Sequence, residues 1–309
     1  MKITHYSNSF ISVKENQTSI ICDPWIGYGS ENGWLSFPIY KNELKLIEKI
    51  KATHVYISHL HCDHFDKKFL KKLNKKKIKI IIKNFRNKRL KEKIRKLGFE
   101  NILECDEWTK YKINKDISIA IIPQITSNSS DADDAINYDL DTSIIIQSNF
   151  SKKIFYNNVD NPLSIKDLIK VKNFARKEFN NKIDLLCTPT GAAGEYPHCF
   201  TNINRVAEKQ KIVNAHLVNL SKQLKALEIK NFFPAGGIYT IYGKFHYLNN
   251  LIAEPKENQV EGLCKKLNVN YFNILGGNNL SLKKGKWSKG ETNKVLTSKE
   301  KIIKKTKNI

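Results

Sequence analysis

The sequence predicts an α/β fold in which helices cover the faces of sheets. Apolar β-type runs alternate along the chain with amphipathic segments whose apolar residues recur at helical spacing. Several strand-like runs end in loops that carry an aspartate or a histidine, a usual place for functional side chains in α/β proteins. A chain of 309 residues with 40% hydrophobic content is sufficient for one large sandwich with a substantial core.

Each expected strand is an apolar or alternating run bounded by turn residues, and each expected helix has an apolar stripe with polar or lysine-rich flanks. The strands expected in order are 2–13, 18–23, 53–58, 78–82, 117–123, 142–147, 153–157, 183–186, 230–233 and 271–275. The helices expected between them are 41–51, 66–75, 87–97, 163–178, 201–227 and 256–267. The polar turns 14–17 and 148–151 indicate hairpins, and Pro24 ends the second strand just after Asp23.

No linker or internal repeat divides the chain. We expect one catalytic domain over residues 1–282, followed by a lysine-rich tail over 283–309 with little apolar periodicity after Trp287. No apolar run is long enough to cross a membrane, and the first residues lack the apolar core of a signal peptide. The six scattered cysteines contain no Cys-x-x-Cys pair, which argues against disulfide, iron–sulfur and zinc-ribbon frameworks. We therefore expect a cytoplasmic protein that contacts no membrane.

The formal charge of +23 comes mainly from lysine and has two interpretations. A basic face could attract nucleic acid, anionic lipid or a phosphorylated substrate. Alternatively, the lysines are ordinary solvated surface residues. The most basic segment, 67–96, has no interleaved aromatic residues of the kind that stack on bases, so nucleic acid is an unlikely partner.

The segment 57–64 (Ile-Ser-His-Leu-His-Cys-Asp-His) contains three of the eight histidines, directly after an apolar run. Neutral imidazole and ionised carboxylate are good ligands for Zn, Fe or Mn. Residues two apart in an extended segment point the same way, so His59 and His61 can bind one ion. A turn at Cys62 directs Asp63 and His64 to a neighbouring position. The segment therefore predicts a metal site.

A His-x-His-x-Asp-His loop after a strand, with an aspartate at a later strand end, resembles the metallo-β-lactamase fold superfamily. The resemblance implies a four-layer αβ/βα sandwich with metals at one edge. It implies His59 and His61 as ligands of a first metal and Asp63 and His64 as ligands of a second. Asp160 would bridge the two ions, which makes Asp63 and Asp160 the expected catalytic residues.

A narrower resemblance, to the catalytic domain of CMP-N-acetylneuraminate hydroxylases, covers most of the chain. The matching segments in order are Asp23-Pro24-Trp25, Gly33-Trp34, Tyr56 to His59, Asp141 to Ile146, Asn158-Val159-Asp160, Gly191 to Phe200 and Phe233-Pro234. It implies an iron-dependent monooxygenase of a nucleotide sugar, with Trp25, Trp34 and His198 in the substrate-binding loops. Those hydroxylases also carry a Rieske domain, whose two-Cys, two-His pattern does not occur here, so an oxygenase would need a separate electron donor.

A second departure concerns the third ligand of the first metal, a histidine in this family. No histidine lies between His64 and His198, and the corresponding position is Asn137. Either the first metal is weakly held, or a neighbouring carboxylate, Asp134 or Asp139, replaces the imidazole. A carboxylate makes the site harder and favours Fe or Mn over Zn, and diiron β-hydroxylases of this fold look similar at that position.

The resemblance also implies a late histidine ligand for the second metal. His246 is the best-placed candidate, although a surface role is an equal alternative. His198 is another candidate, whereas His216 lies mid-helix and is interpreted as structural.

Three functions follow from these expectations. The first is a dinuclear hydroxylase of a small anionic or nucleotide-linked substrate, with two iron ions as the expected metals. The second is a hydrolase of a phosphoester, lactone or amide that uses a metal-bridging hydroxide, with Zn or Mn as alternative metals. The third is a nuclease, supported only by charge. The carboxylate-rich interval around Asp134 and Asp139 favours the first over the second.

Overall fold

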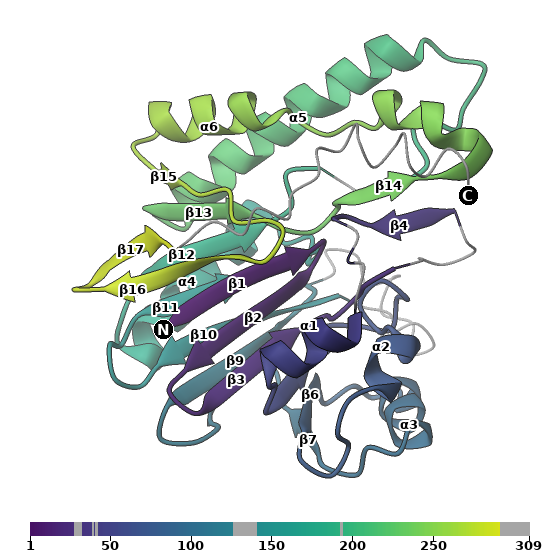
Figure 1. Ribbon diagram of the computed structural model, residues 1–309. Helices are drawn as coiled ribbons and strands as arrows, with labels where there is room; N and C mark the ends of the chain where they lie inside the picture. Colours follow the sequence, from purple (N-terminus) through teal and green to yellow (C-terminus); the bar gives the residue numbers. More distant parts are fainter. Residues whose placement is uncertain (28–32, 39, 41–42, 126–140, 192–193, 291–309) are drawn as a thin grey trace.

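The computed structural model describes residues 1–27, 33–38, 40, 43–125, 141–191 and 194–290. The described residues form two large sheets that face each other, with helices on both outer faces (Figure 1). The order of the eight-stranded sheet is β17-β16-β1-β2-β3-β5-β6-β7, and that of the seven-stranded sheet is β15-β13-β12-β11-β10-β9-β8. A two-stranded sheet pairs β14 with β4. The four-layer αβ/βα sandwich expected from the sequence is confirmed.

The strands of the first large sheet are β1 (Lys2–Ser7), β2 (Phe10–Glu15), β3 (Thr18–Cys22), β5 (His54–Tyr56), β6 (Lys79–Lys83), β7 (Ile102–Cys105), β16 (Asn278–Lys283) and β17 (Lys286–Lys289). Those of the second are β8 (Lys110–Lys112), β9 (Ile117–Pro123), β10 (Thr142–Ser148), β11 (Ile154–Asn157), β12 (Ile183–Thr188), β13 (Asn231–Pro234) and β15 (Asn270–Tyr271). The small sheet contains β4 (Trp34–Ser36) and β14 (Tyr239–Ile241).

Alternation along the central strands divides the core into layers. In β10, Ile144 and Ile146 pack between the two sheets, whereas Ile145 packs on the helical side. In β6, Ile81 points between the sheets and Ile80 points towards the helices on the other side. Successive strand residues face opposite sides of a sheet, so an almost continuous apolar strand indicates burial on both faces.

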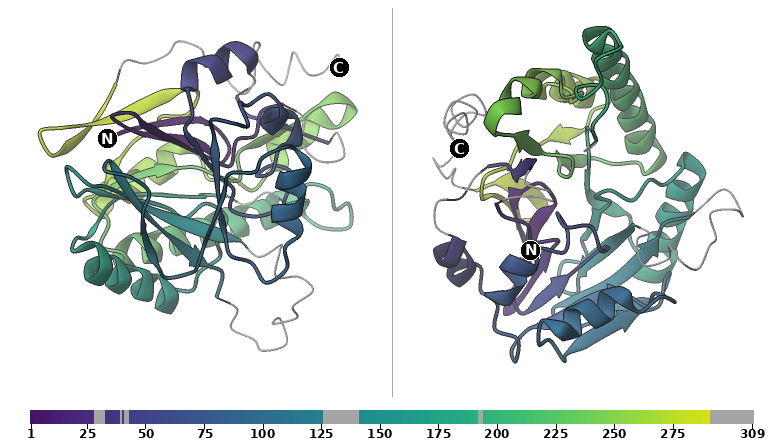
Figure 2. Two further views of the ribbon diagram at one scale, coloured as in Figure 1. Left: turned by 90° about the horizontal axis from the view of Figure 1, so that it is seen from below. Right: turned by 90° about the vertical axis from the view of Figure 1, so that its right-hand side faces the viewer.

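The helices lie on the two outer faces, as the two further views in Figure 2 also show. They are α1 (Glu43–Ile50), α2 (Lys67–Lys71), α3 (Arg89–Lys96), α4 (Ile165–Phe179), α5 (Arg205–Ala226) and α6 (Glu257–Lys266), with the 3₁₀ helix η4 (Gly243–Leu251). Residues of α2 and α3 pack against the first sheet, and residues of α4, α5 and α6 against the second. Among the described helices, none combines the length and apolar character needed to cross a bilayer.

Several elements differ from the sequence prediction. Residues 2–13 form two strands, because Asn8 has a positive φ of 36° and turns the chain between β1 and β2. The expected strand at 271–275 is reduced to β15. The short strands β4, β7, β8 and β14 were not predicted from their residues, because runs of three or four residues carry little periodicity.

The first residues of the expected tail, from 283 onwards, belong to the folded sandwich, because β16 ends at Lys283 and β17 follows at Lys286–Lys289. β16 and β17 form a hairpin, and β16 pairs with β1 at the edge of the first sheet. Trp287 is buried in the core between the sheets. Residues 291–309, the rest of the expected tail, lie outside the described residues.

Phe155 of β11 tests the importance of the core between the sheets. Its ring is fully buried and lies 5.8 Å from that of Phe233 in a stacked arrangement. We expect Phe155→Ala to lower the free energy of unfolding by about 3–5 kcal/mol, because it removes apolar contacts and leaves a cavity. Urea unfolding followed by circular dichroism measures the change. Phe150→Ala is the matched control, since Phe150 is 59% exposed in the adjacent turn and should change stability little; equal losses in both variants would contradict the assignment.

Candidate metal centre

The candidate site lies where strand ends of the two large sheets meet. The His59–His64 loop follows β5 of the first sheet, whereas Asp141 precedes β10 and Asp160 follows β11 of the second. β10 and β11 are antiparallel, so the start of one and the end of the other lie at the same edge. The packing of the two sheets therefore brings the loop after β5 close to the edge formed by the start of β10 and the end of β11.

A hydrogen-bonded contact joins the two sheets at this edge. Thr142 at the start of β10 donates from Oγ1 to the Ser58 carbonyl at 2.7 Å. The Tyr56 hydroxyl lies 2.6 Å from the same Thr142 oxygen. All three residues are buried, and the contact fixes the histidine loop against the residue that precedes β10.

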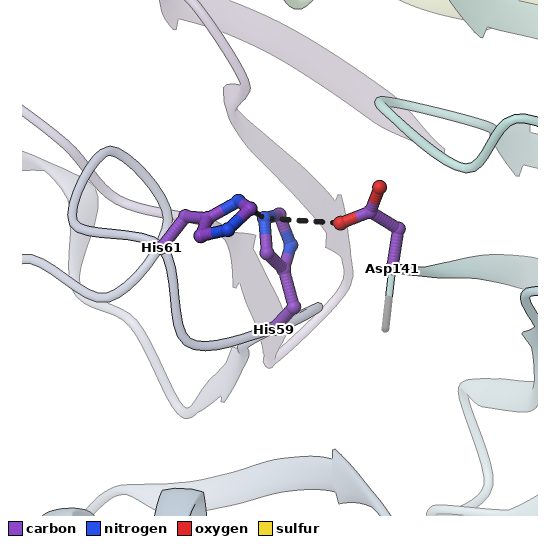
Figure 3. Close-up of side chains that lie close together, drawn as sticks. All are labelled: His59, His61 and Asp141. Carbon is purple, nitrogen blue, oxygen red and sulfur yellow. Dashed lines mark hydrogen bonds and ion pairs between the residues drawn. The ribbon is translucent and has the colours of Figure 1, made fainter. Parts of the chain in front are cut away.

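The first group of possible ligands contains His59, His61 and Asp141 (Figure 3). The Nε2 atom of His59 lies 2.8 Å from Nδ1 of His61 and 3.1 Å from Oδ1 of Asp141. One ligand atom from each of the three residues lies within 4.8 Å of the other two. Two imidazoles and a carboxylate directed at one point form a suitable donor set for a divalent metal ion.

The second group contains Asp63, His64 and Asp160. The Nε2 atom of His64 lies 2.6 Å from Oδ2 of Asp160 and 3.5 Å from Oδ2 of Asp63. The two groups are adjacent, since the ring centroids of His59 and His64 are 4.2 Å apart. Together they supply three imidazoles and three carboxylates, which fits a pair of metal ions.

Asp23 and Ser58 orient the histidines from behind. Oδ2 of Asp23 lies 3.1 Å from Nδ1 of His64, and Oδ1 accepts the Ser58 backbone N–H at 2.8 Å. The Ser58 hydroxyl lies 2.8 Å from Nδ1 of His59 and 3.2 Å from Nδ1 of His64. With their Nδ1 atoms engaged in this way, both rings present Nε2 to the site, the usual arrangement of carboxylate–histidine–metal contacts.

The backbone shapes the second group. His64 lies in a tight turn in which the backbone N–H groups of His64 and Phe65 both donate to the His61 carbonyl, at 3.0 and 2.7 Å. Asp160 has a positive φ of 61°, a strained conformation for a residue other than glycine, and its Oδ2 atom lies 2.6 Å from Nε2 of His64. Gly236 passes so close that a Cβ atom there would lie 3.0 Å from Asp160 Oδ1.

The electrostatics differ between the two groups. Burial, together with the neighbouring His64 and His61, holds the pKa of His59 well below its usual value, so this ring is neutral and ready to bind a metal. Burial would also lower the pKa of His64, but the carboxylates of Asp63 and Asp160 outweigh it and raise that pKa well above the usual value. Asp23 acts in the same direction.

A cavity of about 720 Å³ opens over both groups. All six possible ligands line it, together with Trp34 from β4, the loops after β11 and β12, and one side of α5. The α5 residues that line it are His216, Asn219 and Gln223. A cavity of this size has room for a small molecule beside the two groups of possible ligands.

Of the three residues predicted to bind the substrate, Trp34 lines the cavity, whereas Trp25 and His198 are not among the described lining residues. Trp34 lines the cavity and stacks on Tyr239, with ring centroids 4.7 Å apart. Trp25 is buried in the cluster beneath β4 and β14, and His198 is buried with its ring 6.5 Å from that of Tyr239. Neither Trp25 nor His198 is among the described residues that line the cavity.

His246 lies in η4, where its Nδ1 atom is 3.0 Å from the Gly243 carbonyl oxygen. Neither described group of possible ligands includes it. Asp134 and Asp139 lie outside the described residues. Their predicted ligand roles, and that of His246, stay predictions.

Sequence reasoning did not single out Asp141 as a ligand. It was noted only as part of the Asp141-Thr142 segment, although its place at the start of a strand beside the missing histidine was a usable signal. His216 was interpreted as structural because it lies mid-helix, yet it lines the cavity. Which side of α5 faces the site depends on how the helix packs, and the local sequence does not specify this.

Comparison with families of known proteins finds no match. A protein of Mycolicibacterium smegmatis, named as a candidate Rieske 2Fe-2S iron–sulfur protein, is 27% identical over 125 residues, 40% of this chain and 24% of that protein. A similarly named protein of Mycobacterium tuberculosis is 28% identical over 125 residues, with the same coverage. The match thus spans about a quarter of the length of these curated relatives. These names fit the resemblance to CMP-N-acetylneuraminate hydroxylases.

Three solved structures share the fold over most of this chain. A variant of the CmlA β-hydroxylase has a TM-score of 0.58 at 14% identity and covers 88% of this chain and 52% of its own. Isothiocyanate hydrolase from Delia radicum gut bacteria has a TM-score of 0.57 at 13% identity and covers 91% and 99%. A possible metal-dependent hydrolase from Veillonella parvula has a TM-score of 0.59 at 16% identity and covers 90% and 98%.

The fold of these three structures agrees with the architecture described above. The two facing sheets, the outer helices and the histidine loop at one edge of the sandwich form the expected arrangement. The possible ligands lie at the end of β5 and around β10 and β11, where the resemblance to the superfamily implied a metal site. The chain therefore has the metallo-β-lactamase fold, and two adjacent groups of His and Asp side chains that could hold metal ions lie at one edge of its sandwich.

Proposed function

We propose that this protein is a diiron hydroxylase of a small-molecule substrate. The observation that carries the proposal is the composition of the first group, in which the Asp141 carboxylate lies beside the imidazoles of His59 and His61. A carboxylate in this position makes the donor set richer in oxygen, which favours iron or manganese over zinc. Two ferrous ions would supply the electrons and the open coordination positions that activate O₂ for insertion into a C–H bond.

The protein's own residues have distinct roles in this proposal. His59, His61 and Asp141 would hold the first ion, and Asp63, His64 and Asp160 would hold the second. The constrained backbone of Asp160 and the close approach of Gly236 keep its carboxylate in place. Trp34 and the cavity wall position the substrate over the ions and exclude water.

An electron donor is part of the proposal, because a hydroxylase that splits O₂ needs electrons from outside the substrate. The described cysteines are all free thiols and include no cluster site. The curated relatives named for a Rieske iron–sulfur protein support an iron–sulfur donor for this chain. We therefore propose a separate electron-transfer partner.

The described cavity gives little support to the anionic or nucleotide-linked substrate that the sequence predicts. The described residues that line the cavity include no lysine or arginine, although the chain has 53 of these residues. An anionic group on the substrate would therefore have to bind at the metal ions themselves.

The alternative is a metal-dependent hydrolase of a phosphoester, lactone or amide. Two of the similar structures are described as hydrolases, and together they support this class as strongly as the CmlA β-hydroxylase supports the first. Under this alternative the bound metal would be zinc or manganese, and the same side chains would hold the ions. The Asp141 carboxylate favours the hydroxylase.

Metal analysis separates the two functions. We expect protein purified without added metal to contain about two iron ions per chain, because the two groups offer six hard or borderline ligands. Elemental analysis measures the content, and anaerobic reduction followed by O₂ should change the absorption spectrum. Zinc in place of iron, together with turnover of a phosphodiester or lactone, would contradict the hydroxylase and support the hydrolase.

Asp141→His tests the carboxylate in the first group. We expect this variant to shift the bound metal from iron towards zinc, because it gives the first group a third imidazole in place of a carboxylate, and zinc sites favour imidazole. Asp141→Ala should lose the first ion and roughly half of the bound iron. Elemental analysis after refolding with equal iron and zinc measures both effects.

Asp134→Ala and Asp139→Ala serve as comparisons for Asp141. If either of these variants loses iron while Asp141→Ala keeps it, the missing imidazole is replaced by that residue and not by Asp141.

Asp23→Asn tests the orientation of His64. We expect the affinity for iron to fall by about 10- to 100-fold, because the buried carboxylate behind His64 fixes the ring and strengthens it as a ligand. Competition with a chelator of known affinity measures the change. Asp184→Asn is a matched control, since Asp184 is similarly buried in β12 but pairs with Lys153. Equal affinities in the Asp23 variant and the wild type would exclude the role.

A further inference from the structure

We infer that one side of α5, formed by His216, Asn219 and Gln223, recognises an uncharged hydrogen-bonding group of the substrate, such as a carboxamide or a hydroxyl. The inference rests on the proposed function and deepens it, because the possible metal ligands line the same cavity. It concerns the part of the substrate that lies away from the metals, which neither the sequence nor the comparisons specify.

The helix presents these residues as one surface. Positions 216, 219 and 223 are separated by three and four residues, which places them on the same side of an α-helix. All three line the metal cavity. The adjacent side of α5 carries the buried residues Val213, Leu220 and Leu224, of which Leu220 and Leu224 pack in the core, so the helix cannot rotate without exposing buried apolar surface.

Most of the polar atoms on this surface are available to a ligand. In the described part of the chain no hydrogen bond engages the His216 ring or the Asn219 amide. Gln223 accepts from the Thr188 hydroxyl through Oε1 at 3.4 Å, which leaves its NH₂ group to donate. The surface therefore offers both donors and acceptors, the set that a carboxamide or a hydroxyl requires.

The surface carries no positive charge to match a phosphate. The lysines of α5 nearest in sequence, Lys222 and Lys225, are not among the described residues that line the cavity. Burial lowers the pKa of His216, so its ring is neutral near pH 7. A phosphate ester against this surface would lose hydration without gaining an ion pair.

Binding of matched probe pairs to the iron(II)-loaded full chain, measured by anaerobic titration calorimetry, tests the inference. Each pair contains a neutral compound and its phosphate ester, for example N-acetylglucosamine and N-acetylglucosamine 6-phosphate. For each pair in which binding is detected, we expect the neutral compound to bind more tightly than its phosphate ester. Asn219→Leu and Gln223→Met, which keep the shape but remove the amide, should each weaken it by about tenfold, the effect of one lost hydrogen bond to a desolvated partner.

Two further variants sharpen the test. Asn214→Leu is the matched control, because Asn214 lies on α5, is exposed and is not among the described cavity residues; its affinities should equal those of the wild type. Asn219→Lys should reverse the preference within each pair, since it places a positive charge on the surface.

The inference is overturned if wild-type protein prefers the phosphate esters, if no probe binds, or if both amide substitutions leave the affinities unchanged. Iron content and O₂ uptake are recorded separately. Zinc binding with hydrolytic turnover would contradict the diiron proposal alone, whereas retained iron chemistry with no effect of the α5 variants would contradict this inference alone.

Discussion

The hydrogen bonds around Thr142 are the contact on which the candidate centre depends. The two sheets of the sandwich contribute different possible ligands, and only their alignment at one edge brings these side chains together. Thr142 is bound to Ser58 and Tyr56 across 84 and 86 residues of sequence, in a region without solvent. Because buried polar groups are costly when unpaired, this contact favours one alignment of the sheets over neighbouring ones. The apolar core also stabilises the sandwich, but apolar contacts are not directional and therefore discriminate less between alternative alignments of the two sheets.

Much of the architecture could be predicted from the sequence, because both faces of the central strands are buried and their composition is nearly continuous in Ile, Leu and Val. The loop 57–64 was recognisable because its possible ligands are local. Asp141 was not, since its proximity to His59 depends on the packing of one sheet against the other. The same reason applies to His216, whose side of α5 is decided by core contacts. Trp25 is buried beneath β4 and β14, a pairing of two three-residue strands that local sequence does not indicate.

The charge of the chain and the charge of the site are opposed. Lysines dominate the composition, yet the described cavity lining combines imidazoles, carboxylates and amides. The candidate ligands are surrounded by a carboxylate-rich environment, which stabilises bound cations and raises the pKa of His64. Net charge is therefore a poor guide to the substrate of this protein, because none of the described residues that line the cavity is a lysine or an arginine. Long-range attraction of an acidic partner is a separate property that such a surface can provide.

The division of the ligands between two sheets has a consequence for folding. His59, His61, Asp63 and His64 come from one sheet, and Asp141 and Asp160 come from the other. An ion that binds residues of both sheets stabilises only the chain in which the sheets have already docked. A metal ion bound in this way would hold the two sheets together, and its contribution to stability would grow with the free metal concentration. Once filled, the centre would oppose separation of the two halves.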